Sequence, residues 1–316
     1  MYFITDYIEK PDIERKILGK PLEIDQRAGA RVLLVWHEII DENYLSVFTD
    51  LEGVVRYGVG YDNIDLSALA TRNIVFCNTP DYGVDEVSDT TVAMILNISR
   101  GVFRYDFLCR SYQKERWQEE TIPSLLRNSD LHIGVIGAGR IGGSVCRKLN
   151  AVGFNVSIFD PYVPSGHEKM LGVKRAFTLT DLLATCDQIS IHVPLTSETR
   201  GMVTDEFISA MKPGAALINT ARGGIVESLD VIEKGLCTGH LGSVALDVLP
   251  DEPPDFGHGL IKSWKNNEEW LDGRLIINPH AAYFSQRAFK EMREKAAMNV
   301  KRILNGEKPT NVIQQQ

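Results

Sequence analysis

Three short segments of this 316-residue chain bring together the side-chain types that proton transfer to a keto acid requires. NTARGG contains Arg222, DVLPDEPP contains Glu252, and NPHAAY contains His280. A guanidinium can hold a carboxylate through two hydrogen bonds and polarise the neighbouring keto oxygen. Histidine titrates near neutral pH and can protonate an alkoxide, while a carboxylate behind it orients the ring and stabilises its charged form. The set predicts reduction of a 2-keto acid to a 2-hydroxy acid.

Each of these residues also has a purely structural interpretation. Arg222 could form a surface ion pair, Glu252 could cap the turn made by the two prolines after it, and His280 could be a hydrogen-bonded core histidine. All three nevertheless follow strand-like runs in a region that also carries a nucleotide-binding motif, and this coincidence favours catalysis. The other six histidines lie outside these three segments: His37, His132, His167, His192, His240 and His258.

A glycine-rich motif, GAGRIG, begins at Gly137, after an apolar run and before a helical pattern. In a dinucleotide-binding turn, Gly137 allows the turn itself, Gly139 lets the backbone approach a diphosphate, and Gly142 lets the helix pack on the strand. The helix N-terminus then faces the diphosphate. Asp160 ends the next strand-like run, 18 residues after Gly142. Its carboxylate would accept hydrogen bonds from the adenosine ribose and repel a 2′-phosphate, which predicts NAD rather than NADP.

Apolar runs and helical patterns alternate along most of the chain, which is typical of a doubly wound parallel sheet. The predicted strands of this Rossmann unit are 131–137, 155–160, 188–194, 215–221, 242–248 and 275–279. The predicted helices between them are 141–153, 179–186, 204–211 and 228–235. His192 closes one of these strands, so we expect it to line the cofactor cleft.

A second, smaller α/β unit of flavodoxin-like type is predicted from weaker strand runs at 31–36, 52–57 and 73–77. One long helix is expected over 84–113, with an apolar face from Val84 to Val102. Another is expected over 286–305, closed by Gly306, and the segment 255–273 reads as a loop. The smaller unit is therefore predicted as discontinuous. The predicted domains are a substrate domain, 1–82 with 286–316, and an NAD-binding domain, 83–285.

Composition excludes several classes of protein. The net charge of −8 argues against a nucleic-acid partner. No apolar run is long enough for a membrane helix, and the N-terminus lacks the pattern of a secretory signal. The five cysteines are scattered without metal-ligand spacing. We therefore expect a cytoplasmic protein with reduced thiols, no metal, no membrane partner and no nucleic-acid partner.

The motifs together resemble the D-isomer-specific 2-hydroxyacid dehydrogenase family. Within it, RYGVGYDNI, FDPY and PHAAYFS resemble the branch that contains the C-terminal-binding protein corepressors. The resemblance covers about residues 50–310. It implies that the catalytic Arg, Glu and His are Arg222, Glu252 and His280. It also implies a two-lobed subunit that closes on its substrate, and a homodimer built through the cofactor domains.

The binding residues follow from the motifs and this resemblance. The predicted cofactor-binding residues are Gly137, Gly139, Arg140, Ile141, Gly142, Asp160, His192, Val193, Pro194, Thr199, Thr220, Ala221, Asp247 and Thr91. The predicted substrate-binding residues are Val59, Gly60, Arg222 and Tyr283. The backbone N–H groups of Val59 and Gly60 would assist Arg222, and Tyr283 would line the pocket three residues after the acid.

The chain departs from the corepressor pattern in three places. Tyr283 replaces a tryptophan, 255–273 is longer, and less sequence precedes the first clear strand. Two alternative functions stay open. One is an NAD(H)-sensing scaffold with secondary dehydrogenase activity, and the other is a non-redox α/β protein, such as a methyltransferase, that uses the same glycine turn.

Overall fold

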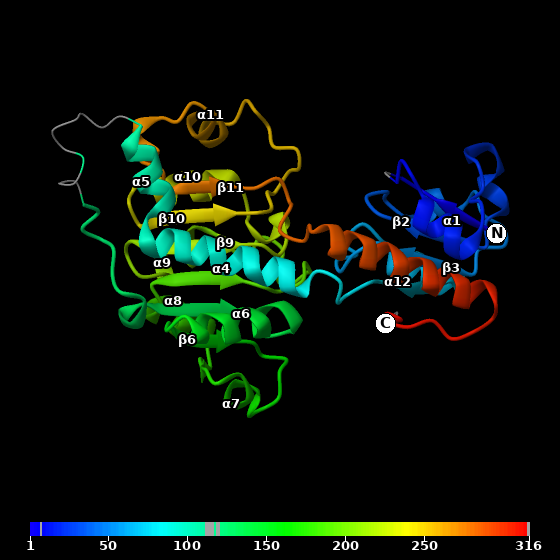
Figure 1. Cartoon of the computed structure of the whole chain (residues 1–316), viewed down its shortest axis with the longest axis horizontal. Helices are drawn as coiled ribbons and strands as arrows, with labels where there is room; N and C mark the ends of the chain where they lie inside the picture. Colours follow the sequence, from blue (N-terminus) through cyan, green and yellow to red (C-terminus); the bar gives the residue numbers. More distant parts are fainter. Residues whose placement is uncertain (7, 111–116, 118–120, 315–316) are drawn as a thin grey trace. The chain divides into compact units, whose positions relative to one another are not determined.

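The computed structural model describes residues 1–6, 8–110, 117 and 121–314. The chain divides into two compact units, Met1–Gly83 with Phe284–Gln316, and Val84–Tyr283 (Figure 1). These divisions lie one and two residues from the boundaries that the sequence predicts. Across the described residues, no helix combines the length and the apolar character needed to cross a bilayer.

The larger unit is built on a seven-stranded parallel sheet with the strand order β11-β10-β9-β8-β5-β6-β7. Its strands are β5 (His132–Ile136), β6 (Asn155–Phe159), β7 (Lys174–Arg175), β8 (Gln188–Ile191), β9 (Ala215–Asn219), β10 (Leu241–Leu246) and β11 (Leu275–Ile277). The chain leaves β5 in one direction through β6 and β7 and then returns to β8 on its other side. This reversal is the switch point at which doubly wound folds bind ligands.

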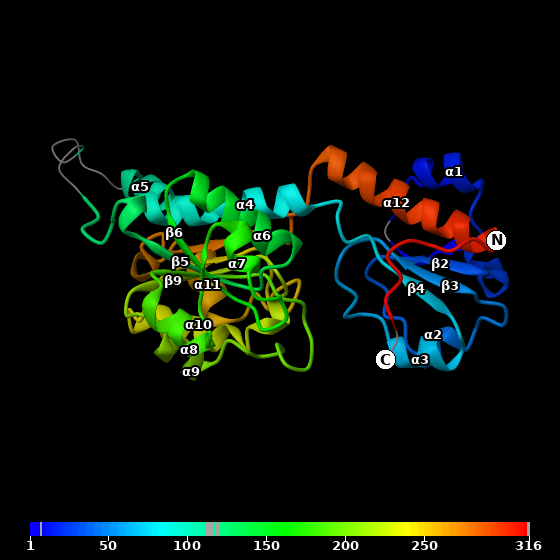
Figure 2. The ribbon, with the colours of Figure 1, turned by 90° about the horizontal axis from the view of Figure 1, so that it is seen from below.

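Helices cover both faces of this sheet, which explains why its strands are continuous apolar runs. The helices are α4 (Val84–Arg100), α5 (Val102–Cys109), α6 (Arg140–Ala151), α7 (His167–Leu171), α8 (Leu179–Thr185), α9 (Asp205–Ala210), α10 (Leu229–Cys237) and α11 (Gly259–Lys265). Figure 2 shows α4 and α6 on one face and α8, α9 and α10 on the other. Two apolar cores result, one on each face. The two-residue strand β7 was not predicted.

The smaller unit is also an α/β unit, with a four-stranded parallel sheet in the order β1-β2-β3-β4. Its strands are β1 (Tyr2–Ile4), β2 (Val32–Val35), β3 (Gly53–Arg56) and β4 (Val75–Cys77). The flavodoxin sheet has the order 2-1-3-4-5. The sheet of the smaller unit matches that order without strand 2, the edge strand next to the first. Its helices are α1 (Asp12–Leu18), α2 (Glu42–Leu45), α3 (Leu66–Thr71) and α12 (Gln286–Leu304). The prediction missed β1.

A buried ion pair fastens α12 to α1 within this smaller unit. Arg293 donates to both carboxylate oxygens of Glu14, at 2.9 and 2.6 Å, and the Tyr57 hydroxyl donates to the same carboxylate at 2.9 Å. Because Glu14 is fully buried, its charge requires these partners. The C-terminal helix is thereby tied to the first helix of the chain.

One helix prediction and one loop prediction were wrong. The helix expected over 84–113 is two helices, α4 and α5, because Gly101 between them adopts a left-handed backbone with φ of 61°, and residues 111–113 lie outside the described residues. Much of its apolar face, including Val87 and Met94, is buried in the unit's own core. The segment 255–273, expected as a loop, contains α11 and a short 3-10 helix at Glu269–Leu271.

Candidate active site

The glycine motif forms a tight turn between β5 and α6, as the sequence predicts. A Cβ on Gly142 would lie 1.9 Å from the carbonyl oxygen of Gly137, so only glycine lets the helix approach the strand this closely. A Cβ on Gly139 would meet no heavy atom within 4 Å. Gly139 is the N-cap of α6, and Arg140 and Ile141 form its first turn. Open space at a helix N-terminus fits a diphosphate.

Asp160 directly follows β6, beside this turn. One carboxylate oxygen accepts a hydrogen bond from the Ala138 backbone N–H at 2.8 Å, and the other accepts from the Tyr162 N–H at 2.9 Å. Each carboxylate oxygen offers two lone pairs. The backbone therefore holds the carboxylate still and leaves capacity for two ribose hydroxyls.

Three further side chains surround this corner of the unit, and sequence reasoning missed all of them. The Tyr162 hydroxyl donates to the carboxylate of Glu198, on the loop after β8. His167 Nε2 donates to the carbonyl oxygen of Ala138 at 2.9 Å, so this histidine, one of the six outside the predicted catalytic segments, contacts the glycine turn. Glu198 lies on the loop that carries the predicted cofactor residues Val193, Pro194 and Thr199, but nothing in the sequence pattern indicated its link to Tyr162.

The loop after β8 is held by its own polar groups. Thr199 Oγ1 donates to the Pro194 carbonyl at 2.6 Å and accepts from the Thr196 N–H at 2.8 Å. Val193 packs against Gly137, where a Cβ would come within 2.8 Å of its side chain. Of the predicted cofactor residues on this loop, Val193 therefore adjoins the glycine turn, and Pro194 and Thr199 are bonded to each other.

His192 precedes this loop, and burial lowers its pKa to about 3. Its Nε2 lies 2.8 Å from Ser190 Oγ. Its Nδ1 is buried and has no hydrogen-bond partner among the described residues. The ring is therefore neutral at pH 7, so it cannot supply a proton, and it carries an unused polar atom near the predicted cofactor site.

Thr220 and Arg222 lie in a rigid turn after β9. Thr91 donates to the Val87 carbonyl at 2.8 Å, so its contact of 2.8 Å with Thr220 uses the Thr220 proton. Asn219 closes the turn, since its side chain accepts from the Ala221 N–H at 3.0 Å and donates to the Arg222 carbonyl at 2.9 Å. Thr91, which the sequence predicts as a cofactor contact, is fully buried. The side-chain contact that the structure gives it is with Thr220.

A close backbone approach brings the Arg222 turn to the loop that carries Glu252. A Cβ on Gly223 would lie 1.7 Å from the carbonyl oxygen of Leu249. The Leu249 N–H donates to Glu252 Oε1 at 2.9 Å. Two of the predicted catalytic segments are therefore packed against each other by a contact that requires glycine.

Glu252 and His280 form a hydrogen-bonded pair, with Oε2 and Nδ1 separated by 2.7 Å. Burial raises the pKa of Glu252, but the hydrogen bond and charge of His280, the Leu249 N–H and the charge of Arg222 together outweigh burial and hold that pKa below its ordinary value. The carboxylate is thus charged at neutral pH. With Nδ1 engaged, Nε2 of His280 makes no hydrogen bond to any described residue and can serve a ligand.

Asp247, predicted from the resemblance as a cofactor contact, holds the backbone around His280. It is 2 % exposed. Its carboxylate accepts from the Ala281 N–H at 3.0 Å and from the Ala282 N–H at 3.0 and 3.1 Å, and its carbonyl oxygen accepts from the His280 N–H at 2.8 Å. His280 has a φ of 54°, a left-handed conformation that costs free energy in a residue with a side chain. Four hydrogen bonds to Asp247 maintain it.

The predicted substrate-binding residues fall in both units. Tyr283 is half-buried at the end of the larger unit. Val59 and Gly60 lie in the smaller unit, where the buried Asn78 donates to the Val59 carbonyl at 2.6 Å and steadies the loop. Sequence reasoning did not identify Asn78.

One cluster among the described residues has the composition of a metal site: Asp230, Glu233 and His258. His258 Nδ1 accepts from the Leu260 N–H at 3.1 Å, and its Nε2 lies 3.1 Å from Asp230 Oδ1. A neutral ring that accepts at Nδ1 carries its proton on Nε2. His258 therefore has no lone pair to offer a metal ion, and the cluster is a helix cap whose ring also donates a hydrogen bond to Asp230.

Comparison with known proteins identifies related sequences. Residues 92–282 match the family model described as D-isomer specific 2-hydroxyacid dehydrogenase, NAD binding domain. C-terminal-binding protein 1 of Caenorhabditis elegans is 30% identical over 287 residues, which are 88% of this chain and 38% of that protein. D-3-phosphoglycerate dehydrogenase of Methanocaldococcus jannaschii is 31% identical over 263 residues, 83% of this chain and 47% of that protein. The chain spans less than half the length of either relative.

Solved structures match over nearly the whole chain. D-lactate dehydrogenase from Aquifex aeolicus, complexed with NAD and lactic acid, superposes with a TM-score of 0.82 at 28% identity and covers 97% of this chain and 96% of its own. NADPH-dependent glyoxylate/hydroxypyruvate reductase from Sinorhizobium meliloti, in complex with NADP and malonate, gives a TM-score of 0.79 at 26% identity, with 98% and 89% covered.

Proposed function

This chain belongs to the D-isomer-specific 2-hydroxyacid dehydrogenase family, and on that premise we propose that it reduces a small 2-keto acid to its D-2-hydroxy acid with NADH, or catalyses the reverse. The observation that carries the proposal is the contact of 2.7 Å between His280 Nδ1 and Glu252 Oε2. It leaves Nε2 of the same ring for the substrate, and the neighbouring turn carries Arg222.

Residues 92–282 make up an NAD-binding domain. The glycine turn, with open space at Gly139, would hold the diphosphate, and Asp160 would hold the adenosine ribose. The unpartnered Nδ1 of His192 offers a further polar contact. When bound, the nicotinamide supplies or accepts the hydride at C2 of the substrate.

The chain's own residues bind the substrate acid and transfer the proton. Arg222 holds the substrate carboxylate and polarises the keto oxygen. As C2 is reduced, His280 donates its Nε2 proton to the substrate oxygen and becomes neutral. Throughout, Nδ1–H donates to Glu252, whose negative charge stabilises the protonated ring before transfer. For oxidation of the hydroxy acid, the neutral ring accepts the hydroxyl proton and the charge returns beside Glu252.

The alternative is an NAD(H)-sensing scaffold with secondary dehydrogenase activity. The similarity to C-terminal-binding protein 1 supports it. The intact Arg222, Glu252 and His280 set favours the enzyme. We propose that the protein is a homodimer, and this rests on the resemblance alone. We also propose that it is located in the cytoplasm, which the five free cysteines support.

Turnover of a panel of keto acids with NADH tests the proposed function: glyoxylate, hydroxypyruvate, pyruvate, phenylpyruvate and 3-phosphohydroxypyruvate. We expect at least one to be reduced, with His280→Ala lowering kcat by about 100-fold or more. His258→Ala is the matched control and should leave kcat unchanged. Tight NADH binding without turnover of any keto acid would instead support the scaffold.

A further inference from the structure

The larger unit contains a pocket of about 380 Å³ among the residues that begin its strands. Leu131, Gln188, Ala215 and Gly242 line it, and each lies at or next to the first residue of β5, β8, β9 or β10. The catalytic segments follow the opposite, carboxyl ends of the strands. The pocket is therefore separate from the proposed active site, and its volume lies in the range of small-molecule sites.

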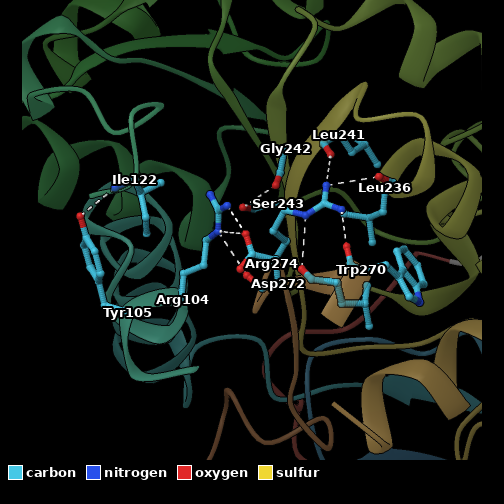
Figure 3. A network of polar contacts seen from close by, with 11 residues as sticks. Arg104, Tyr105, Ile122, Leu236, Leu241, Gly242, Ser243, Trp270, Asp272 and Arg274 are labelled. Carbon is cyan, nitrogen blue, oxygen red and sulfur yellow. Dashed lines mark hydrogen bonds and ion pairs between the residues drawn. The ribbon is translucent and has the colours of Figure 1, made fainter. Parts of the chain in front are cut away.

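Positive charge predominates around this pocket. Arg104, Lys212 and Arg274 line it, together with Asp187. Lys212 pairs with Asp187. Arg104 pairs with Asp272, and Figure 3 shows the Arg104 and Arg274 side chains on either side of that carboxylate. Three cations thus face two carboxylates, which favours an anionic ligand.

The two arginines differ in the bonds that they leave available. Arg274 donates only to backbone carbonyl oxygens, those of Leu236, Leu241, Trp270 and Leu271, at 2.9 to 3.4 Å (Figure 3). Arg104 uses Nε and Nη2 for Asp272, and its Nη1 makes no hydrogen bond to any described residue. Arg104 can therefore donate to a bound carboxylate without losing its ion pair.

A buried amide in the same pocket has an unused acceptor. Gln188 is 3 % exposed, and its Nε2 donates to Ser99 Oγ at 2.7 Å. Ser99 gives its own proton to the Ile95 carbonyl at 2.8 Å, so it must accept from Gln188, and the amide cannot be flipped. Oε1 is left without a partner among the described residues. An unsatisfied buried carbonyl is costly, so this atom requires a donor.

Apolar side chains complete the lining: Ile98, Leu125, Leu126 and Leu131. We propose that this pocket binds a small carboxylic acid that carries an amino or hydroxyl group and an apolar chain. The carboxylate pairs with Arg104, the amino or hydroxyl group donates to Gln188 Oε1, and the hydrocarbon lies against the leucines. This site goes beyond the proposed function and does not depend on it.

Isothermal titration with matched ligands tests the proposal. The probes are leucine, 2-hydroxy-4-methylpentanoate and 4-methylpentanoate, which share a carbon skeleton and differ only at C2. The full chain with Arg222→Ala is used, so that the proposed active site has lost its carboxylate grip. We expect leucine or the hydroxy acid to bind about tenfold more tightly than 4-methylpentanoate, the value of one buried hydrogen bond. Which of the two binds identifies the donor as amino or hydroxyl.

Two further substitutions separate the contributions. Gln188→Leu should abolish the tenfold preference, and Arg104→Gln should weaken all three acids while the preference stays. Gln26→Leu, at an exposed position, is the matched control and should change nothing. If the three acids bind equally, or do not bind, the proposal is wrong and Oε1 is satisfied by an internal water. Keto-acid turnover by the wild type is measured separately, so failure of this site and failure of the proposed function remain distinct.

Discussion

His280 Nδ1 lies 2.7 Å from Glu252 Oε2, although 28 positions separate the two residues in the chain. The ring is held twice, because its side chain bonds to Glu252 and its strained backbone bonds to Asp247. A catalytic acid needs its proton-bearing atom in one place. The Glu252 carboxylate holds the side chain of His280, and the backbone carbonyl oxygen of Asp247 holds its backbone N–H.

Replacing Glu252 with Gln should shift both pH limits of the reaction. The folded protein holds the pKa of Glu252 below its ordinary value. Glu252 is therefore negatively charged at neutral pH, and its charge favours the protonated ring of His280. Without that charge, His280 should lose its proton at lower pH. The alkaline limit of kcat/KM for reduction and the acidic limit for oxidation should both move downward. Full pH profiles in both directions measure these shifts.

Arg222→Lys is the control for this experiment, because it should weaken binding and polarisation of the acid without a comparable movement of either limit. Superimposable profiles for the wild type and Glu252→Gln would remove Glu252 from the mechanism.

Cofactor choice should depend on two carboxylates. A 2′-phosphate beside Asp160 would be a like-charge contact, and this predicts a preference for NADH over NADPH of about 100-fold or more. Asp160→Ala should narrow the preference. Glu198, held by Tyr162, adds a second negative charge, so adding Glu198→Gln should narrow it further. Fluorescence titration gives Kd for each cofactor.

Tyr162→Phe, which releases Glu198 but keeps both charges, is the matched comparison and should have a smaller effect than the loss of Asp160. Equal kcat/KM for the two cofactors in the wild type would refute the assignment of Asp160.

Asp247→Asn should loosen the turn that carries His280. The new amide nitrogen would face the Ala282 N–H, leaving two buried donors opposed. We expect the free energy of unfolding to fall by about 1–3 kcal/mol and kcat to fall as well. Asp251→Asn, four residues on and exposed, is the matched control for denaturant unfolding and kinetics. An Asp247→Asn protein with wild-type stability and kcat would show that these bonds do not position His280.

Tyr283→Ala should change the order of preference among keto acids, because this residue lies three positions after His280 at the end of the larger unit. Relative kcat/KM over the keto-acid panel and Tm are measured together. If the ranking stays constant while Tm falls sharply, Tyr283 is a core residue and does not select the substrate.

Light scattering after size exclusion tests the proposed dimer. A homodimer of this 35.3 kDa chain should give about twice that mass at micromolar concentration, whereas a mass near that of one chain would contradict it.

The sequence by itself determined the main strands of the larger unit and the types of its site residues. A parallel strand covered on both faces must be apolar throughout, so every main strand could be read from its run of residues. The glycine turn could also be predicted from the sequence. A Cβ at Gly142 would lie 1.9 Å from the Gly137 carbonyl oxygen, so no other residue fits at this position. Such constraints act on neighbours in the chain, so the local sequence records them.

Only the tertiary structure decided which distant residues meet. The contacts of His280 with Glu252 and Asp247, of Tyr162 with Glu198, and of Thr91 with Thr220 depend on strand order and register, which no local pattern encodes. The left-handed Gly101, where the predicted helix breaks into α4 and α5, shows the same limit, because glycine permits both a helical and a left-handed backbone. Packing of the surrounding elements selects one of these conformations, and that selection is made in three dimensions.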